Sequence, residues 1–120
     1  MIYLASPYTH RDPHVVNCRF YDTKRAFAYM LQAGEHVYSP IVLCHQVSID
    51  YRLPSDADYW EKFDFNFLRR CDELRILMLD DWKESRGVRA EIKAATAIHL
   101  PITYWKLGIN AVFHHPKPED

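Results

Sequence analysis

The sequence is poor in glycine and cysteine and has no long apolar run. Only three of its 120 residues are glycine, and neither the GxGxxG turn of dinucleotide-binding folds nor a phosphate-binding P-loop is present. The three cysteines are far apart and odd in number, with no CxxC pair, so we expect no disulfide framework and a reducing compartment. No stretch approaches the roughly 20 apolar residues of a membrane-spanning helix, and the N-terminus lacks the basic residues of a signal peptide. We therefore expect a cytoplasmic protein without membrane attachment.

An excess of charge of either sign is also missing. The chain has 15 basic and 16 acidic residues, interspersed along its length, and a formal net charge of −1. This balance argues against a nucleic-acid polymer or an anionic membrane as partner, while a small charged ligand stays compatible with it. Neighbouring Cys44 and His45 do not by themselves form a nucleophile–base pair, and we expect Cys44 to be buried packing. The histidines lack metal-ligand spacing, so no metal or organic cofactor is expected. The histidines in question are His36, His45, His99, His114 and His115.

Apolar runs alternate with amphipathic segments along a chain that is long enough for one hydrophobic core. This alternation predicts a doubly wound α/β fold, flavodoxin- or Rossmann-like, with a parallel sheet of about four to five strands flanked by helices. Residues 1–115 form a single domain in this interpretation, and residues 116–120 a loose tail. The expected strands are Ile2–Ala5, Glu35–Ser39, Leu74–Leu79 and Ile102–Trp105, and the expected helices run from Pro13 to about Gln32, from Asp58 to Cys71 and from Gly87 to His99.

Local signals mark where several of these elements begin and end. Asp12 before Pro13 predicts a capped helix start, and Gly34 predicts the end of that helix. Ser55 or Asp56 is expected to cap the second helix. Between the first and the second expected helix, the sequence indicates one helical turn over 41–48 and a loop over 49–57. A further short segment is expected around residues 111–113.

One carboxylate lies where a polar side chain is unusual. The third expected strand leads through a polar loop into Ser85-Arg86-Gly87-Val88-Arg89-Ala90-Glu91, and ligands of open α/β sheets bind beyond the carboxyl ends of strands, against helix N-termini. On a helix starting here, Glu91 shares a stripe with Ala95 and Ile98. A carboxylate on an apolar face needs a partner or a function. The simpler alternatives are a favourable helix-dipole position or an ion pair with Arg89 or Arg70.

Three motifs, in this order, support a family resemblance. They are Ile2-Tyr3-Leu4-Ala5-Ser6-Pro7-Tyr8, Asp64 eight residues before Asp72, and Ser85-x-Gly87-Val88-x-x-Glu91. Over about residues 2–104 the chain resembles the nucleoside 2-deoxyribosyltransferase superfamily, which includes 2′-deoxynucleoside 5′-monophosphate N-glycosidases. The resemblance implies cleavage or transfer at the N-glycosidic bond of a (deoxy)nucleoside or nucleoside 5′-monophosphate. It also implies a homodimer or larger homo-oligomer.

The resemblance assigns three catalytic residues. Glu91 matches the nucleophile that attacks the anomeric carbon, Tyr3 the tyrosine that orients it, and Asp64 the aspartate that contacts the base and assists its departure. The chemistry is consistent, because a carboxylate stabilises or captures an oxocarbenium ion and the leaving base needs a proton. Alternatively, Tyr3 is an aromatic strand residue that packs on a helix, and Asp64 is a solvated aspartate paired with Lys62 or Arg69. Asp72 is expected to cap or end its helix.

Five further residues are candidates for substrate binding. Ser85 and the backbone near Gly87 suit a phosphate, although Ser85 is equally a plain helix cap. Ser6 stands where the family usually has glycine. Arg89 replaces a small residue and would either crowd the sugar or bind an anion. Asn110 is the candidate that completes the site of a neighbouring subunit.

Two other function classes stay open at this point. The departures at Ser6 and Arg89 are compatible with a nucleotide-binding module that has lost turnover. A structural or interaction protein on the same fold is the other alternative, with Glu91 held in a salt bridge.

Overall fold

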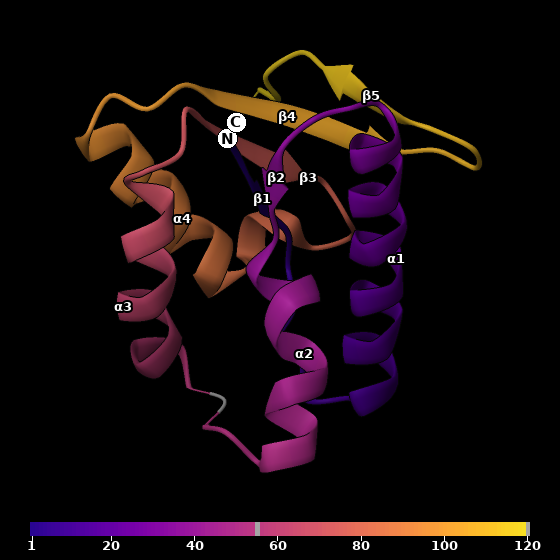
Figure 1. Cartoon of the computed structure of the whole chain (residues 1–120), viewed down its shortest axis with the longest axis vertical. Coiled ribbons are helices and arrows are strands. Elements are labelled where there is room, and N and C mark those ends of the chain that lie inside the picture. The colour runs from indigo at the N-terminus through magenta and orange to yellow at the C-terminus, as the bar shows by residue number, and fades with distance from the viewer. Residues whose placement is uncertain (55, 120) are drawn as a thin grey trace.

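The sheet has the order β2-β1-β3-β4-β5 in the computed structural model, which describes residues 1–54 and 56–119 (Figure 1). The strands are β1 (Ile2–Ala5), β2 (Val37–Tyr38), β3 (Glu73–Leu77), β4 (Ile102–Leu107) and β5 (Val112–His115). The first four run parallel to one another. The predicted doubly wound α/β fold is confirmed.

The fifth strand departs from the expected parallel arrangement, because β5 runs antiparallel to β4. Its connection to β4 spans only residues 108–111, and a parallel crossover needs a dozen or more residues. The hairpin is closed by the Gly108 amide, which donates to the Ala111 carbonyl at 2.8 Å.

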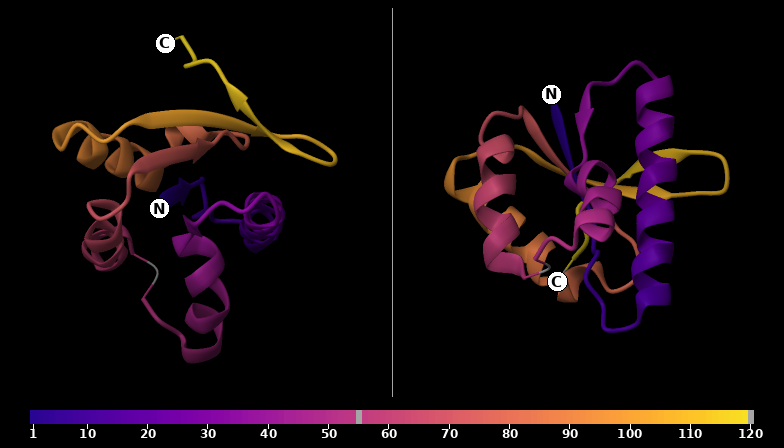
Figure 2. Two further views of the ribbon diagram at one scale, coloured as in Figure 1. Left: turned by 45° about the horizontal axis from the view of Figure 1, so that its top comes forward. Right: turned by 60° about the horizontal axis from the view of Figure 1, so that its bottom comes forward.

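Four helices and a 3₁₀ turn cover the sheet, within the described part of the chain. They are α1 (Pro13–Gln32), α2 (Pro40–Tyr51), α3 (Ala57–Leu68), η1 (Trp82–Glu84, the 3₁₀ turn) and α4 (Arg86–Ala97). Figure 2 shows α2 lying between α1 and α3. None of these helices is both long and apolar enough to cross a membrane.

Alternate residues of the central strands fill two separate cores. Tyr3 and Ile76 point into a cluster with Leu68 of α3 and Val88 of α4. Leu4 and Leu77 point the other way, into a cluster with residues of α1. This alternation follows from the two-residue period of a strand, and it places Tyr3 on the same side of the sheet as α3 and α4.

The helix starts follow the predicted capping chemistry. The Asp12 carboxylate accepts from the His14 amide at 2.9 Å, and Asp56 accepts from the Tyr59 amide at 2.8 Å. Ser55, the alternative cap, lies outside the described residues. Gly34 has φ +84° and ends α1 as predicted.

Three segments differ from expectation. The region expected as one turn and a loop is the 12-residue helix α2, capped by Ser39 and ended by Arg52 with φ 50°; its apolar residues are spread around the helix, so no amphipathic period marks it. α3 stops at Leu68 instead of Cys71, because the chain turns there and the Cys71 amide bonds the Leu68 carbonyl. Asp72 does not cap α3: its carboxylate pairs with the N-terminal ammonium, and its amide donates to the Met1 carbonyl.

The tail expected to be loose carries no helix or strand over residues 116–119. The Lys83 ammonium donates to the Glu119 carbonyl at 3.1 Å. Asp120 lies outside the described residues.

Candidate active site

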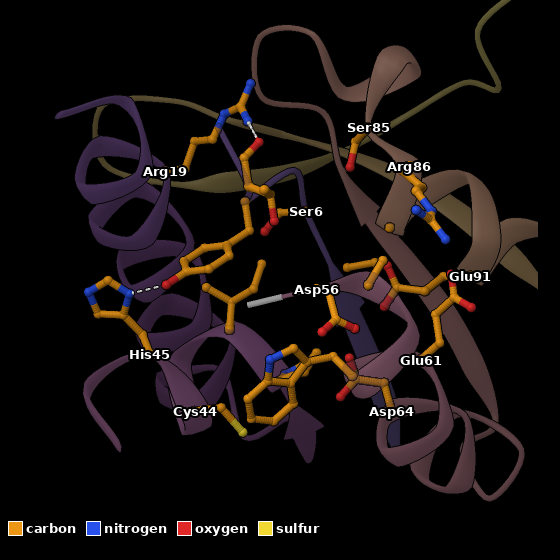
Figure 3. A pocket seen from close by; sticks show the side chains of 18 of the residues that line it. Ser6, Arg19, Cys44, His45, Asp56, Glu61, Asp64, Ser85, Arg86 and Glu91 are labelled. Atoms are coloured by element: carbon orange, nitrogen blue, oxygen red, sulfur yellow. Dashed lines mark hydrogen bonds between the residues drawn. The ribbon is translucent and has the colours of Figure 1, made fainter. Parts of the chain in front are cut away.

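A cavity of about 700 Å³ lies between the loop after β1, α2, α3 and the start of α4 (Figure 3). Its size is typical of small-molecule sites. Because β1 and β3 are parallel neighbours, their carboxyl ends meet at one edge of the sheet, and the cavity opens there. In Figure 3, Asp64, Glu61 and Glu91 lie on the side of α3 and α4, while Arg19 and His45 lie on the opposite side.

Glu91 lies in the second turn of α4 and lines the cavity although its side chain is only 9% exposed. No ion pair among the described residues includes it, so the expected alternatives Arg70 and Arg89 do not neutralise it. Burial raises the pKa of Glu91 to about 8. The interaction with the Tyr3 hydroxyl opposes this rise, and the negative charges of Asp64 and Glu61 add to it.

Tyr3 is fully buried beneath Glu91, and its ring packs against Tyr38 with centroids 5.5 Å apart. Its hydroxyl has no partner of regular hydrogen-bond geometry among the described residues. The hydroxyl is nevertheless close enough to the Glu91 carboxyl to lower the pKa of that group. Burial, and then the charges of Glu91 and Asp64, raise the pKa of Tyr3 well above its usual value. Tyr3 is thus both a packing residue and a neutral donor beside Glu91.

For the N-glycosidic chemistry that the family resemblance implies, replacing Tyr3 with phenylalanine is expected to slow turnover by roughly 10- to 100-fold without loss of stability. The hydroxyl favours the ionised form of Glu91, so its removal should move the acidic limb of the kcat profile to higher pH. Tyr38→Phe is the matched control, because it also removes a buried hydroxyl without a regular partner. Measured kcat–pH profiles that are equal for both variants would contradict the role given to Tyr3.

Asp64 lies on α3 and faces the cavity beside Trp60 and Phe65. Its Oδ1 atom is covered and has no hydrogen-bond partner among the described residues. No ion pair with the expected alternatives Lys62 or Arg69 is found in the described part of the chain. Burial raises the pKa of Asp64 to about 7. A carboxyl that is partly protonated at neutral pH suits a general acid.

Ser85 and Gly87 line the same cavity at the start of α4. The Ser85 hydroxyl accepts from the Val88 amide at 3.3 Å, so it caps α4 as the simpler interpretation expected. A Cβ atom at Gly87 would meet only the Ser85 hydroxyl, at 4.0 Å. Glycine therefore leaves open space here.

Ser6 follows β1 and is 5% exposed at the cavity wall. Its hydroxyl lies 2.8 Å from the Thr23 hydroxyl. Because Thr23 donates its own proton to the Arg19 carbonyl at 2.8 Å, Ser6 must be the donor to Thr23. Ser6 is left with acceptor lone pairs only.

Two predicted substrate contacts lie outside the lining of this cavity. Arg89 is exposed, and its Nε atom donates to the Lys83 carbonyl at 2.7 Å. Asn110 is exposed in the turn between β4 and β5. The structure brings together Tyr3, Asp64, Glu91, Ser6, Ser85 and Gly87, but not Arg89. The assignment of Asn110 to the site of a neighbouring subunit stays a prediction.

Several lining residues were not identified from the sequence. Glu61 lies three residues before Asp64, and this i, i+3 spacing on one helix face was an available signal. Tyr8 and His45 come together only through tertiary structure, with the hydroxyl 2.6 Å from Nδ1. The His45 ring stacks on Phe20 at 3.9 Å, and burial lowers its pKa. Across the described residues, no group of three or more His, Cys, Asp or Glu side chains could hold a metal ion.

The comparisons with known proteins give one family. No curated protein matches the sequence. A family model described as a domain of unknown function (DUF1937) matches residues 1–107, a span that runs from β1 through β4 and includes every residue of the cavity lining. The match covers most of the chain, and the protein therefore belongs to the DUF1937 family.

Proposed function

We propose that this protein cleaves or exchanges the N-glycosidic bond of a (deoxy)nucleoside or nucleoside 5′-monophosphate through a covalent intermediate on Glu91. The observation that carries the proposal is the position of Glu91, a buried carboxyl without an ion pair among the described residues, at the wall of the cavity. Tyr3 behind it and Asp64 facing the same cavity supply the donor and the acid that this chemistry needs. The resemblance of the three motifs to deoxyribosyltransferases supports the same roles.

The reaction has two steps. A Glu91 oxygen bonds to C1′ of the sugar as the C1′–N bond breaks, and the electron pair leaves with the base, which takes a proton from Asp64. Water or a second base then attacks C1′ from the opposite face, and Asp64 accepts the proton of the attacking group. Two displacements retain the configuration at C1′.

Chromatography of the free base tests the proposal. The wild-type protein is incubated with a panel of nucleosides and 5′-monophosphates, and a second free base is added to separate transfer from hydrolysis. Release from any member supports the proposed function, and comparison across the panel shows whether phosphate is required. Binding of a nucleotide without base release would instead support the non-catalytic binding module.

Replacing Asp64 with asparagine is expected to lower the release of neutral bases by about 10²- to 10⁴-fold, the usual contribution of a general acid. Asp50→Asn is the control, because Asp50 is an exposed aspartate of α2 outside the cavity lining. The measurement is kcat on the best neutral substrate of the panel. Similar kcat values for both variants would remove Asp64 from the mechanism.

The site is also proposed to be shared between subunits of a homodimer or larger homo-oligomer. Asn110 lies at the tip of the β4–β5 hairpin beside Ile109, which is 89% exposed. Arg25 holds this tip by donating to the Gly108 and Ile109 carbonyls at 2.7 and 3.0 Å. A rigid tip with an exposed apolar residue suits an intersubunit contact, and sedimentation velocity tests it.

A further inference from the structure

Carboxylates dominate the wall of the cavity. Only two guanidinium groups, those of Arg19 and Arg86, line it among the described residues. Arg19 donates to the Thr9 carbonyl at 2.9 Å, and Arg86 is paired with Asp58 at 2.9 Å in an exposed ion pair. Against them stand six carboxylate side chains, those of Asp56, Glu61, Asp64, Asp81, Glu84 and Glu91.

No cationic side chain of the described residues pairs with these six carboxyl groups. Two of them lie deep: Glu91 is 9% exposed, and the Oδ1 atom of Asp64 is covered and has no hydrogen-bond partner among the described residues. A concave site lined by one sign of charge attracts ligands of the opposite sign.

The same cavity has aromatic walls. Trp60, Phe65 and Tyr8 line it, and the Trp60 ring is held in place by its Nε1 atom, which donates to the Pro54 carbonyl at 2.7 Å. Aromatic faces attract cations and stack on flat rings. Carboxylates and aromatic rings together suit a planar cation.

We propose that the substrate is a nucleoside whose base carries a positive charge, such as an N-alkylated purine or a pyridinium ring. This inference rests on the proposed function and specifies its substrate class. A Glu91 oxygen bonds to C1′, and the electron pair of the C1′–N bond returns to the ring and cancels its charge. The base leaves neutral, without needing a proton. Water then attacks C1′, which releases the sugar and one proton and restores the Glu91 carboxylate.

A bound cation would also ionise the nucleophile. Burial raises the pKa of Glu91 to about 8 and that of Asp64 to about 7, so at pH 7 Glu91 is mostly protonated and Asp64 is about half protonated when no cation is bound. A positive ligand favours the carboxylate forms, so its binding releases protons and tightens between pH 6 and 8. The titratable groups that face these two carboxyls are Tyr3 of β1, Tyr38 of β2, Cys44 of α2 and Glu61 of α3. The other ionisable side chains of the lining are those of Arg19, Asp56, Asp81, Glu84, Arg86, His10 and His45.

Two isomeric nucleosides test the charge preference directly. 1-Methyl-2′-deoxyadenosine binds a proton and is a cation at pH 7, whereas its isomer N6-methyl-2′-deoxyadenosine is neutral and differs from that cation by the one proton and the position of the methyl group. Calorimetric titration of Glu91→Gln, used to prevent turnover, should show at least tenfold tighter binding of the charged isomer. Raising the salt concentration from 50 to 500 mM should reduce the difference in affinity between the charged and the neutral isomer. With nicotinamide riboside, whose charge does not titrate, the affinity of Glu91→Gln should rise from pH 6 to pH 8, because Asp64 ionises over this range.

Glu61→Gln tests whether the preference for the charged isomer arises from the carboxylates of this cavity. Removal of one carboxylate beside the ligand should weaken binding of the charged isomer by roughly three- to tenfold and leave the neutral isomer unaffected. Asp22→Asn is the control, because Asp22 lies on α1 outside the lining of this cavity. It should change neither affinity.

The outcomes separate this inference from the proposed function. Equal or tighter binding of the neutral isomer overturns the charge preference, and base release from neutral nucleosides would then leave the proposed function intact. Tight binding of the charged isomer without base release by the wild type supports the proposed ligand class and contradicts the proposed catalytic activity. If neither isomer binds or reacts, the cationic substrate is excluded.

Discussion

Replacing Glu91 with glutamine is expected to lower base release by at least a thousandfold while the protein stays folded. The amide has the shape of the carboxyl but cannot form the bond to C1′, so the covalent step is lost. The measurement is kcat by chromatography of the released base, with circular dichroism to confirm the fold.

Glu84→Gln is the matched control, because Glu84 also lines the cavity but is exposed in η1. We expect it to lose less than tenfold. The role of Glu91 as nucleophile would be excluded if the glutamine variant retained a tenth of the wild-type turnover.

The same Glu91→Gln substitution is expected to make the protein more stable, and increasingly so as the pH rises. The pKa of Glu91 is about 8 in the folded protein against 4.5 for the unperturbed group. Between these values the unfolded chain has released this proton and the folded protein still holds it. The free energy of unfolding therefore falls as the pH rises through this window and levels off above it.

The loss of stability is large because Glu91 is buried. The difference between the two pKa values lowers the free energy of unfolding by about 3 kcal/mol at pH 7 and by about 5 kcal/mol above pH 8. Glutamine does not titrate, so the variant should gain most of this difference, with a Tm higher by roughly 10 °C at pH 7. Urea unfolding at pH 5 and pH 8 measures the effect, and Glu84→Gln serves again as the control. Parallel pH profiles for wild type and Glu91→Gln would show that Glu91 is not held protonated by the fold.

The order of strands and helices was predictable because local chemistry marks it. Asp12, Gly34 and Asp56 act where they stand in the sequence, as caps and a helix stop. The α2 helix was missed because its apolar residues do not repeat on one face, so only its tertiary position identifies it. The antiparallel β5 was missed because the orientation of a final strand depends on the length of the turn before it.

The candidate site was predictable to the extent that topology determines it. The proximity of Tyr3 and Glu91 could be predicted, because β1 and β3 are parallel neighbours whose carboxyl ends meet at one edge of the sheet. The charge of the cavity could be foreseen only in part. Glu61 shares a helix face with Asp64, whereas Arg19 joins the cavity only when α1 packs on the sheet.

The three hydroxyl and carbonyl groups of Ser6, Thr23 and Arg19 have a consequence for ligand selection. Their hydrogen bonds run in one direction, from the cavity wall into α1. Thr23 is buried in α1 and does not line the cavity, but because it takes the proton of the Ser6 hydroxyl, it leaves Ser6 only able to accept at the cavity wall. At that point the wall favours a ligand group with a proton to give, such as a sugar hydroxyl, over one that can only accept.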